Sequence, residues 1–297
     1  MPLGRGSLIL WPPTHRRLIP AVAPMTNVLI ISSFVAASRV GGGAQALALA
    51  RLGVEPILVP TVLLGRHPGW GAPGGSPVEA VIMQAMLAAI AAQGLYAEID
   101  AVVCGYFSRA DQVTVAARAM DIVRAANPAV RLVVDPIMGD EGKGLYVAAE
   151  VAEAIADELV PRADLITPNA WELSRLSDHP VFDPASAVQA ARAIGRPVLA
   201  SSVAVGGEIG VVYADAGQAF LAAHARAVAA PNGSGDLLTL LFAAGLIDLL
   251  EPREALAVAV GGVAEAVAAA QGLAELPVSA MPNALARSPK VRLEALA

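Results

Sequence analysis

The sequence predicts a single α/β domain built on a mostly parallel central sheet. Short β-rich runs alternate with helical segments, a pattern typical of parallel strands joined by right-handed crossovers. Runs such as AVV at 101–103 and LVV at 132–134 are apolar throughout, as expected for strands that helices cover on both faces. Late in the chain, GVVYAD at 210–215 and QAFLAAHAR at 218–226 flank Gly217 and predict an antiparallel hairpin at one edge of the sheet.

The remaining elements follow in order along the chain. Strands are expected at 28–31, 56–60, 101–106, 131–136, 164–168 and 197–202. Helices are expected at about 44–52, 77–93, 110–126, 149–159, 169–176, 184–195, 234–249 and 253–271, with one more in the last twenty residues.

The domain is expected to span residues 27–297. Residues 1–26, in which Pro12 and Pro13 break a short apolar piece, predict an irregular tail, with Met25 as an alternative start. No long polar linker and no fixed-period repeat divides the rest of the sequence. We therefore expect one domain.

Composition narrows the class of ligand. The net charge of −6 offers no basic field for nucleic acid, and the apolar runs are too short for a membrane span. Cys104 is the only cysteine, so no intramolecular disulfide forms, which suits a reducing cytoplasm. Walker, G-x-G-x-x-G, G-x-S-x-G and H-E-x-x-H motifs are all absent. Small molecules are the expected partners.

The turn Gly233-Ser234-Gly235-Asp236 precedes the apolar run LLTLLFAAGL and predicts an anion site. The first turn of a helix offers unpaired backbone N–H groups, and small residues let an oxyanion approach them closely. A carboxylate on the same turn could accept the proton of an attacking hydroxyl during phosphoryl transfer. Helix capping by Ser234 or Asp236 is the simpler explanation of this motif taken alone.

A second candidate site follows the strands at 131–136 and 164–168. Asn169 and Glu172 lie three residues apart, so a helix that begins there presents both on one face. Together with Asp135 they could hold a hydrated Mg²⁺, whereas Asn169 and Glu172 could equally form a capping box. Of the four histidines, His67 in GRHPGWG is the best placed for a ligand.

Taken in order, these loops resemble the ribokinase-like superfamily and, within it, the pyridoxal kinases, from about Asn27 to Gly245. The motifs that carry the resemblance are Ser33 to Gly41, which is similar to S-x-V-x-x-G-x-V-G, then Pro60-Thr61-Val62 with His67 and Gly69, Gly105-Tyr106, DPIMGD at 135–140, TPNAWEL at 167–173, and the GSGD turn.

The resemblance implies a three-layer α/β/α fold and the phosphorylation of the 5′-hydroxymethyl group of pyridoxal, pyridoxine or pyridoxamine by Mg·ATP. Asp236 would be the base, and the amides of Gly233, Ser234, Gly235 and Asp236 would form the anion hole. Family members are generally homodimers, and whether a monovalent cation assists is left open.

The resemblance also assigns the remaining site residues. Those near the nucleotide and Mg²⁺ would be Asp135, Asn169, Glu172, Ser201 and Ser202, with Asp135 and Glu172 at the metal. Those that line the vitamin pocket would be Ser33, Thr61, His67 and Tyr106.

The departures from the family pattern fall on the substrate side. Ala37, Arg39 and Gly42 replace the usual Y, H and N of the first loop, and Ser38 replaces its middle glycine. Gly65, Arg66, Pro68 and Trp70 differ in the second loop. Two alternatives follow: a hydroxymethylpyrimidine kinase, whose motif commonly has Cys in place of Asp236, and a catalytically silent member that binds a B6 vitamer.

Overall fold

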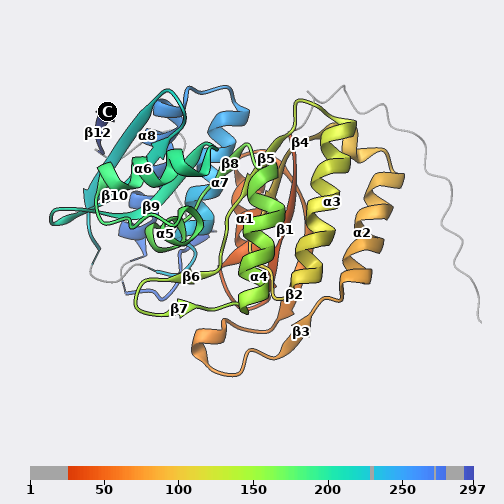
Figure 1. The fold of residues 1–297 in the computed structure, drawn as a ribbon. Helices are drawn as coiled ribbons and strands as arrows, with labels where there is room; N and C mark the ends of the chain where they lie inside the picture. Colours follow the sequence, from red (N-terminus) through yellow and green to blue (C-terminus); the bar gives the residue numbers. More distant parts are fainter. Residues whose placement is uncertain (1–25, 228–230, 271, 279–290) are drawn as a thin grey trace, which may run out of the picture.

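The computed structural model describes residues 26–227, 231–270, 272–278 and 291–297. Within these ranges, ten strands form one sheet in the order β12-β11-β10-β9-β8-β5-β4-β1-β2-β3 (Figure 1). The strands are β1 (Asn27–Val35), β2 (Glu55–Leu64), β3 (Gly75–Pro77), β4 (Ile99–Cys104), β5 (Arg131–Val134), β8 (Leu165–Ile166), β9 (Val198–Val205), β10 (Glu208–Ala214), β11 (Ala219–Ala225) and β12 (Arg292–Leu296).

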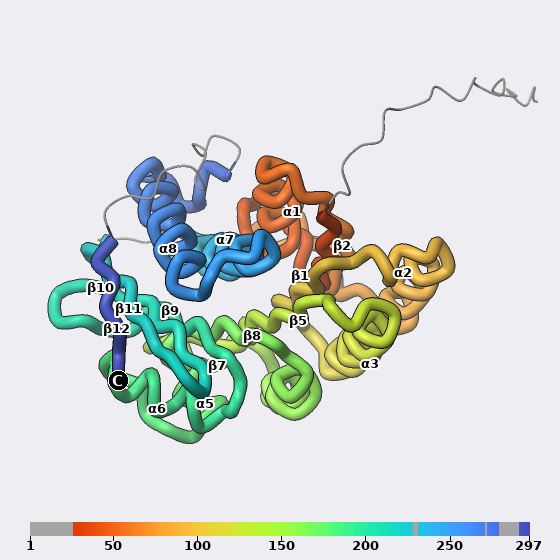
Figure 2. Tube along the Cα trace, turned by 90° about the horizontal axis from the view of Figure 1, so that it is seen from above, coloured from red at the N-terminus to blue at the C-terminus, as the bar shows by residue number. Residues whose placement is uncertain are grey.

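Helices cover both faces of the sheet and confirm the predicted three-layer class (Figure 2). One face packs against α1 (Gly41–Arg51), α7 (Ser234–Ile247) and α8 (Pro252–Ala269). The other packs against α2 (Ala80–Ala92), α3 (Ala110–Ala126), α4 (Ala149–Ala154), α5 (Ala170–Ser177) and α6 (Pro184–Ile194). Successive residues of the central strands alternate between the two cores: Leu29 belongs to one and Ile30 to the other.

The six strands β2, β1, β4, β5, β8 and β9 run parallel, as predicted. The hairpin of β10 and β11 is also confirmed, and it pairs antiparallel from Glu208–Ala225 to Ala214–Ala219. Parallel pairing aligns the carboxyl ends of the six strands along one edge of the sheet, where ligands bind in folds of this kind. This edge is the lower one in Figure 1, where β6 (Gly139–Asp140) and β7 (Gly144–Leu145) also lie.

The structure does not test the helix predicted within the last twenty residues over 279–290, and residues 291–297 are not helical. Residues 279–290 lie outside the described part, and the end of the chain is the strand β12, which pairs antiparallel with β11. Its Leu293 and Leu296 each pack against one of the two hydrophobic cores, and Arg292 forms ion pairs with Glu208 and Glu294 at 3.3 Å. The predicted hairpin therefore lies one strand in from the edge.

Other boundaries differ in detail. The predicted helix 149–159 is α-helical only to Ala154 and continues as a π-helix over Ile155–Leu159. The strand predicted at 164–168 is only two residues long, Leu165–Ile166. The predicted tail, apart from Thr26, lies outside the described residues.

Two further findings bear on the predicted class of protein. No helix in the described ranges is long and apolar enough to cross a membrane. The thiol of Cys104 is buried at the end of β4, and burial raises its pKa to about 12, so it behaves as a core residue rather than a reactive one.

One residue of the fold is held in a conformation that its side chain disfavours. Leu249, which follows α7, has a φ of 64° and a side chain that is 84% exposed. A left-handed conformation costs a β-carbon residue about 1 to 2 kcal/mol, whereas asparagine tolerates it better.

We expect Leu249→Asn to raise the free energy of unfolding by about 1 kcal/mol and Tm by about 2 °C. Differential scanning calorimetry measures the change. Leu249→Ala is the matched control, because alanine removes the same exposed surface but keeps the strain. Equal Tm values for the two variants would show that backbone conformation is not the cause.

Candidate active site

The candidate site lies where the carboxyl ends of β1, β4, β5 and β8 meet the amino end of α7. Backbone bonds continue the sheet beyond the strands, because the N–H of Asp135 donates to the carbonyl of Cys104 at 2.8 Å. The N–H of Thr167 likewise donates to the carbonyl of Val134 at 2.9 Å. These bonds fix the loop after each strand, so the predicted acids come from a rigid edge.

The GSGD turn has the conformation that its glycine predicts. Gly233 precedes α7 with a φ of 91°, and a Cβ on it would stand 2.4 Å from the carbonyl oxygen of Arg39. Only glycine permits both this backbone and this close approach. The turn and the first loop are consequently in direct backbone contact.

Asp236 stands in the first turn of α7 and also faces the first residue of α1. Its Oδ2 accepts a hydrogen bond from the N–H of Gly41 at 2.9 Å. Its Oδ1 is buried and has no hydrogen-bond partner among the described residues. Burial raises the pKa of this carboxyl to about 6, although the Gly41 bond opposes the rise. Asp236 therefore holds one oxygen fixed and keeps the other free to accept a proton.

Gly41 is as constrained as Asp236. It begins α1 with a φ of 62°, and a Cβ there would stand 2.0 Å from the Oγ of Ser33. Ser33 is 7% exposed on β1 and packs against Gly41, the residue whose N–H binds Asp236. This is a packing role for Ser33, which the sequence placed in the vitamin pocket.

Asp135 follows β5 and is buried next to the other acids. Burial is the main cause that raises the pKa of this carboxyl well above its ordinary value, and the charges of Asp236 and Glu172 raise it further. The hydroxyl of Thr239, one turn after Asp236 on α7, donates to Asp135 Oδ2 at 3.0 Å. Thr239 also shares a hydrogen bond of 2.8 Å with Thr167. The protonation of Asp135 therefore depends on the charges of both other acids.

Asn169 and Glu172 form the capping box that the sequence offered as an alternative. The side chain of Asn169 accepts from the N–H of Glu172, and Glu172 Oε2 accepts from the N–H of Asn169, both at 2.9 Å. Glu172 also contacts the neighbouring loop after β5, because its Oε1 accepts hydrogen bonds from the N–H groups of Met138 and Gly139 at 2.9 and 3.2 Å. Burial raises the pKa of Glu172 to about 7, against these bonds.

The same box holds Gly139 from its other side, since Asn169 Nδ2 donates to the carbonyl of Gly139 at 2.9 Å. Gly139 also packs under Trp171, whose ring would stand 2.2 Å from a Cβ at this position. The TPNAWEL segment therefore fixes the DPIMGD loop.

Ser201 and Ser202 lie on β9 beside this helix start. The N–H of Ser201 donates to the carbonyl of Pro168 at 2.9 Å, and Ser201 pairs with Asn169 in a parallel bridge. Ser202 is exposed with a φ of 60°, opposite a register shift between Gly210 and Val212 of β10. The structure brings Ser201 to the acid-bearing edge, and Ser202 points outward at a bulge.

The residues predicted to line the vitamin pocket differ from one another in burial and in their contacts. Thr61 is fully buried, and its hydroxyl donates to the carbonyl of Tyr106 at 2.6 Å, so it joins β2 to the loop after β4. The N–H of Tyr106 in turn donates to Ser32 at 3.2 Å. His67 lies in the loop after β2, where its Nδ1 accepts from the N–H of Gly69 at 3.0 Å and its ring centroid lies 5.6 Å from that of Trp70.

Sequence reasoning missed several residues that hold this site. Thr239 falls in an apolar run, and only its spacing of three residues from Asp236 could have indicated that it shares the same helix face. Ser38 was noted only as a departure from glycine, yet its hydroxyl donates to Glu275, which no pattern singled out.

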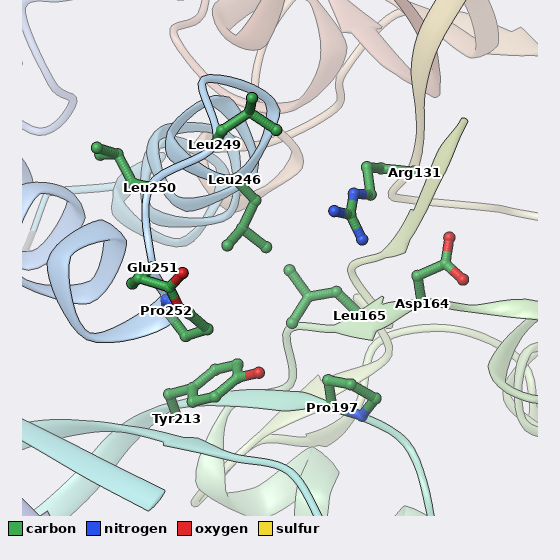
Figure 3. Close-up of a pocket in the computed structure, with 10 residues that line it drawn as sticks. All are labelled: Arg131, Asp164, Leu165, Pro197, Tyr213, Leu246, Leu249, Leu250, Glu251 and Pro252. Atoms are coloured by element: carbon green, nitrogen blue, oxygen red, sulfur yellow. The ribbon is translucent and has the colours of Figure 1, made fainter. Parts of the chain in front are cut away.

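The pocket shown in Figure 3 lies away from this site. It has a volume of about 400 Å³ and lies at the amino end of the parallel strands, where Arg131 begins β5 and Leu165 begins β8. Tyr213 and Leu249 also line it. Asp135 follows the opposite end of β5, so this pocket contains none of the predicted site residues.

The fold is that of the ribokinase-like class of small-molecule kinases. A family model described as phosphomethylpyrimidine kinase matches residues 40–278. The chain is 34% identical over 229 residues to a pyridoxine/pyridoxal/pyridoxamine kinase of Bordetella avium, which covers 74% of this chain and 77% of that protein. It is 33% identical over 250 residues to a pyridoxal kinase of Leifsonia xyli subsp. xyli, covering 82% and 88%.

Solved structures of pyridoxal kinases have the same fold as this chain. A pyridoxal kinase from Entamoeba histolytica superposes with a TM-score of 0.86 at 26% identity, over 92% of this chain and 100% of that one. A pyridoxal kinase from Leishmania donovani in complex with ADP and pyridoxamine gives 0.84 at 25% identity with the same coverage. The chain belongs to the phosphomethylpyrimidine kinase family. The two relatives compared above are kinases of pyridoxal and related vitamers by name.

The bonds of Glu172 predict a cost for losing its charge. Glu172→Gln replaces one acceptor oxygen with an NH₂ group that faces a backbone N–H, which leaves a buried donor without a partner. We expect the free energy of unfolding to fall by about 1 to 3 kcal/mol, measured by urea denaturation.

Glu150→Gln is the matched control, because Glu150 occupies the first turn of α4 but is exposed and makes no capping bond there. A Glu172→Gln protein as stable as wild type would contradict the structural role of the box.

Proposed function

We propose that this chain transfers the γ-phosphoryl group of ATP to the 5′-hydroxymethyl group of pyridoxal, pyridoxine or pyridoxamine. The observation that carries the proposal is the state of Asp236: one oxygen is fixed by Gly41, and the other is buried and has no hydrogen-bond partner in the part of the chain that the structure describes. A buried carboxylate oxygen that lacks a donor is suited to accept the hydroxyl proton of a bound alcohol.

The proposed reaction is an in-line phosphoryl transfer. Asp236 takes the proton as the oxygen of the 5′-hydroxyl attacks the γ-phosphorus, and the bond from that phosphorus to the bridging oxygen of ADP breaks. The N–H groups of Ser234, Gly235 and Asp236 at the amino end of α7 bind the charge that develops on the phosphoryl oxygens. The products are the phosphorylated vitamer and ADP.

The acid group fits a hydrated Mg²⁺. Asp135 is buried, which is the main cause of its raised pKa, and repulsion by the charges of Asp236 and Glu172 raises that pKa further. A divalent cation would relieve this repulsion and would neutralise the charge of the triphosphate. The described residues contain no ready-made cluster of three metal-ligating side chains. We therefore propose that Asp135 holds Mg²⁺ with few protein ligands, and that Glu172 acts mainly through the loop that it fixes.

The proposed ligand positions follow from where the loops lie. Ser201 and Asn169 belong with the nucleotide, because they pair with each other at the acid-bearing edge beyond β8 and β9, and we assign Ser202 to the same ligand only as the residue that follows Ser201. Ser33, Thr61, His67 and Tyr106 belong with the vitamer, because they lie on and after β1, β2 and β4. The L. donovani kinase was solved with ADP and pyridoxamine together, and this supports a two-ligand site in this fold.

A second candidate acceptor is hydroxymethylpyrimidine, the unphosphorylated relative of the phosphomethylpyrimidine in the description of the matching family model. It is also a heteroaromatic ring with a primary alcohol, so the chemistry at Asp236 would be unchanged. A coupled assay of ADP release with pyridoxal, pyridoxine, pyridoxamine and hydroxymethylpyrimidine separates the two. Saturable vitamer binding without turnover would indicate the silent alternative.

We expect Asp236→Asn to lower kcat by about 10² to 10⁴-fold, because the amide cannot accept the proton, with little change in ATP affinity. In wild type, kcat should rise with pH through about 6, since only the ionised carboxylate is a base. Asp248→Asn, an exposed acid at the other end of α7, is the control. An Asp236→Asn protein with unchanged kcat would remove Asp236 from the chemistry.

We also propose a homodimer in the cytoplasm. The helix α2 is almost entirely apolar, yet only Met83 and Leu87 of its residues are buried. Val81 and Ile82 are 71% and 51% exposed. An exposed apolar helix face of this kind is suited to bury against the same face of a second copy. The single buried thiol suits a reducing compartment.

Sedimentation velocity tests the dimer. We expect Ile82→Lys to shift the species toward the monomer mass, because a charge cannot be buried in an apolar interface without a partner. Phe182→Ser is the control: this residue is 67% exposed in the turn between α5 and α6, two helices that lie on the opposite side of Figure 1 from α2. A wild-type monomer at every concentration would contradict the proposal.

A further inference from the structure

Glu275 lies in the segment 272–278 that follows α8, far from the family motifs in sequence. Its Oε1 accepts a hydrogen bond from the hydroxyl of Ser38, and its Oε2 accepts one from the N–H of Arg39 at 2.9 Å. Both oxygens of one carboxylate are therefore used on two consecutive residues of the first loop. Bonds to a charged acceptor are stronger than neutral ones.

The backbone around Glu275 holds the GSGD turn as well. The N–H of Asn232 donates to the carbonyl of Ala274 at 3.0 Å, and the N–H of Leu276 donates to the carbonyl of Asn232 at 3.3 Å. Asn232 and Glu275 form a parallel bridge. The residue next to Gly233 is thus fixed to the same short segment that binds the first loop.

The segment itself is anchored in the core. Leu276 is fully buried and Val278 is 2% exposed, and both pack in the cluster that includes Leu237 of α7. Glu275 is held between these anchors and the loop, so its carboxylate is not free to follow the loop if the loop moves. A half-buried carboxylate on an anchored backbone keeps its position relative to the hydrophobic core.

We propose that Glu275 is a positioning residue that fixes the N–H of Gly41 against Asp236. Ser38 and Arg39 immediately precede the turn to Gly41, and Gly233 touches Arg39. Release of Ser38 and Arg39 would let the amino end of α1 move relative to α7. This inference rests on the proposed role of Asp236, which it deepens.

The proposal agrees with one departure of the sequence. Ser38 stands where the related motif has glycine, and its side-chain hydroxyl, which glycine lacks, donates to Glu275 Oε1. Ser38 is 5% exposed, so its hydroxyl is directed inward rather than to solvent. The pair of Ser38 and Glu275 is therefore a feature of this chain's own first loop.

The test compares Glu275→Gln with wild type in two ways. Hydrogen exchange of the Arg39 and Gly41 amides, followed by NMR, should become about 10-fold faster or more, since a neutral amide supports one of the two bonds less well. In the kinase assay, kcat should fall about 10-fold to 10²-fold with little change in the KM for ATP. The rise of kcat with pH should also move to higher pH, because a weaker Gly41 bond stabilises the ionised Asp236 less.

Two variants keep the test decisive. Ser38→Ala removes one bond without touching Glu275, and its effect should be smaller and not additive with that of Glu275→Gln. Glu254→Gln, an exposed glutamate at the start of α8, should change neither readout. If Glu275→Gln loses stability but keeps its pH profile and its Gly41 exchange rate, Glu275 only supports the fold and the proposal is wrong.

The exchange experiment needs no turnover. Faster exchange at Gly41 in a protein whose wild type phosphorylates none of pyridoxal, pyridoxine and pyridoxamine would overturn the proposed function and leave the positioning role intact. Unchanged exchange at Gly41 in Glu275→Gln, with an active wild-type kinase, would overturn the positioning role and leave the proposed function intact.

Discussion

The hydrogen bond from the Gly41 N–H to Asp236 is the interaction on which the site depends. It joins the first turn of α1 to the first turn of α7, so the positive ends of two helix dipoles meet at one carboxylate. The contact needs glycine at Gly41, which lies against Ser33, and at Gly233, which lies against Arg39. The close approach of two helix starts is therefore built from glycines that no other residue could replace.

This arrangement explains how a buried acid can serve as a base. Burial raises the pKa of Asp236 to about 6, which leaves it ionised at neutral pH but more basic than an exposed aspartate. Asp135 and Glu172 are buried in the same group, and Thr239 connects Asp135 to the helix that carries Asp236. Three acids at one edge are unfavourable without a cation, so the site is suited to a substrate that arrives with one.

The sequence predicted the parts of the site that short motifs encode. Asp135, Asn169 and Glu172 lie where the loops after parallel strands were expected to place them, because strand direction alone brings those loops together, and Asp236 lies at the helix start that its glycine turn predicted. The motif could not separate capping from metal binding at Glu172. The structure shows a capping box whose carboxylate also fixes Met138 and Gly139.

Contacts between distant segments could not be predicted. Ser38 and Glu275 are 237 residues apart, and nothing in the local pattern of either indicates the other. The final strand β12 was not predicted, for the same reason: a short segment with Leu293 and Leu296 takes its conformation from the open edge of β11 rather than from its own propensity.

The most direct test of this account is an NMR titration of the Gly41 amide. The account predicts that its proton and nitrogen shifts follow the ionisation of Asp236 with a midpoint near pH 6, and that the transition disappears in Asp236→Asn. A Gly41 amide that does not titrate, or one that titrates in the ordinary range of an exposed aspartate near pH 4, would contradict it.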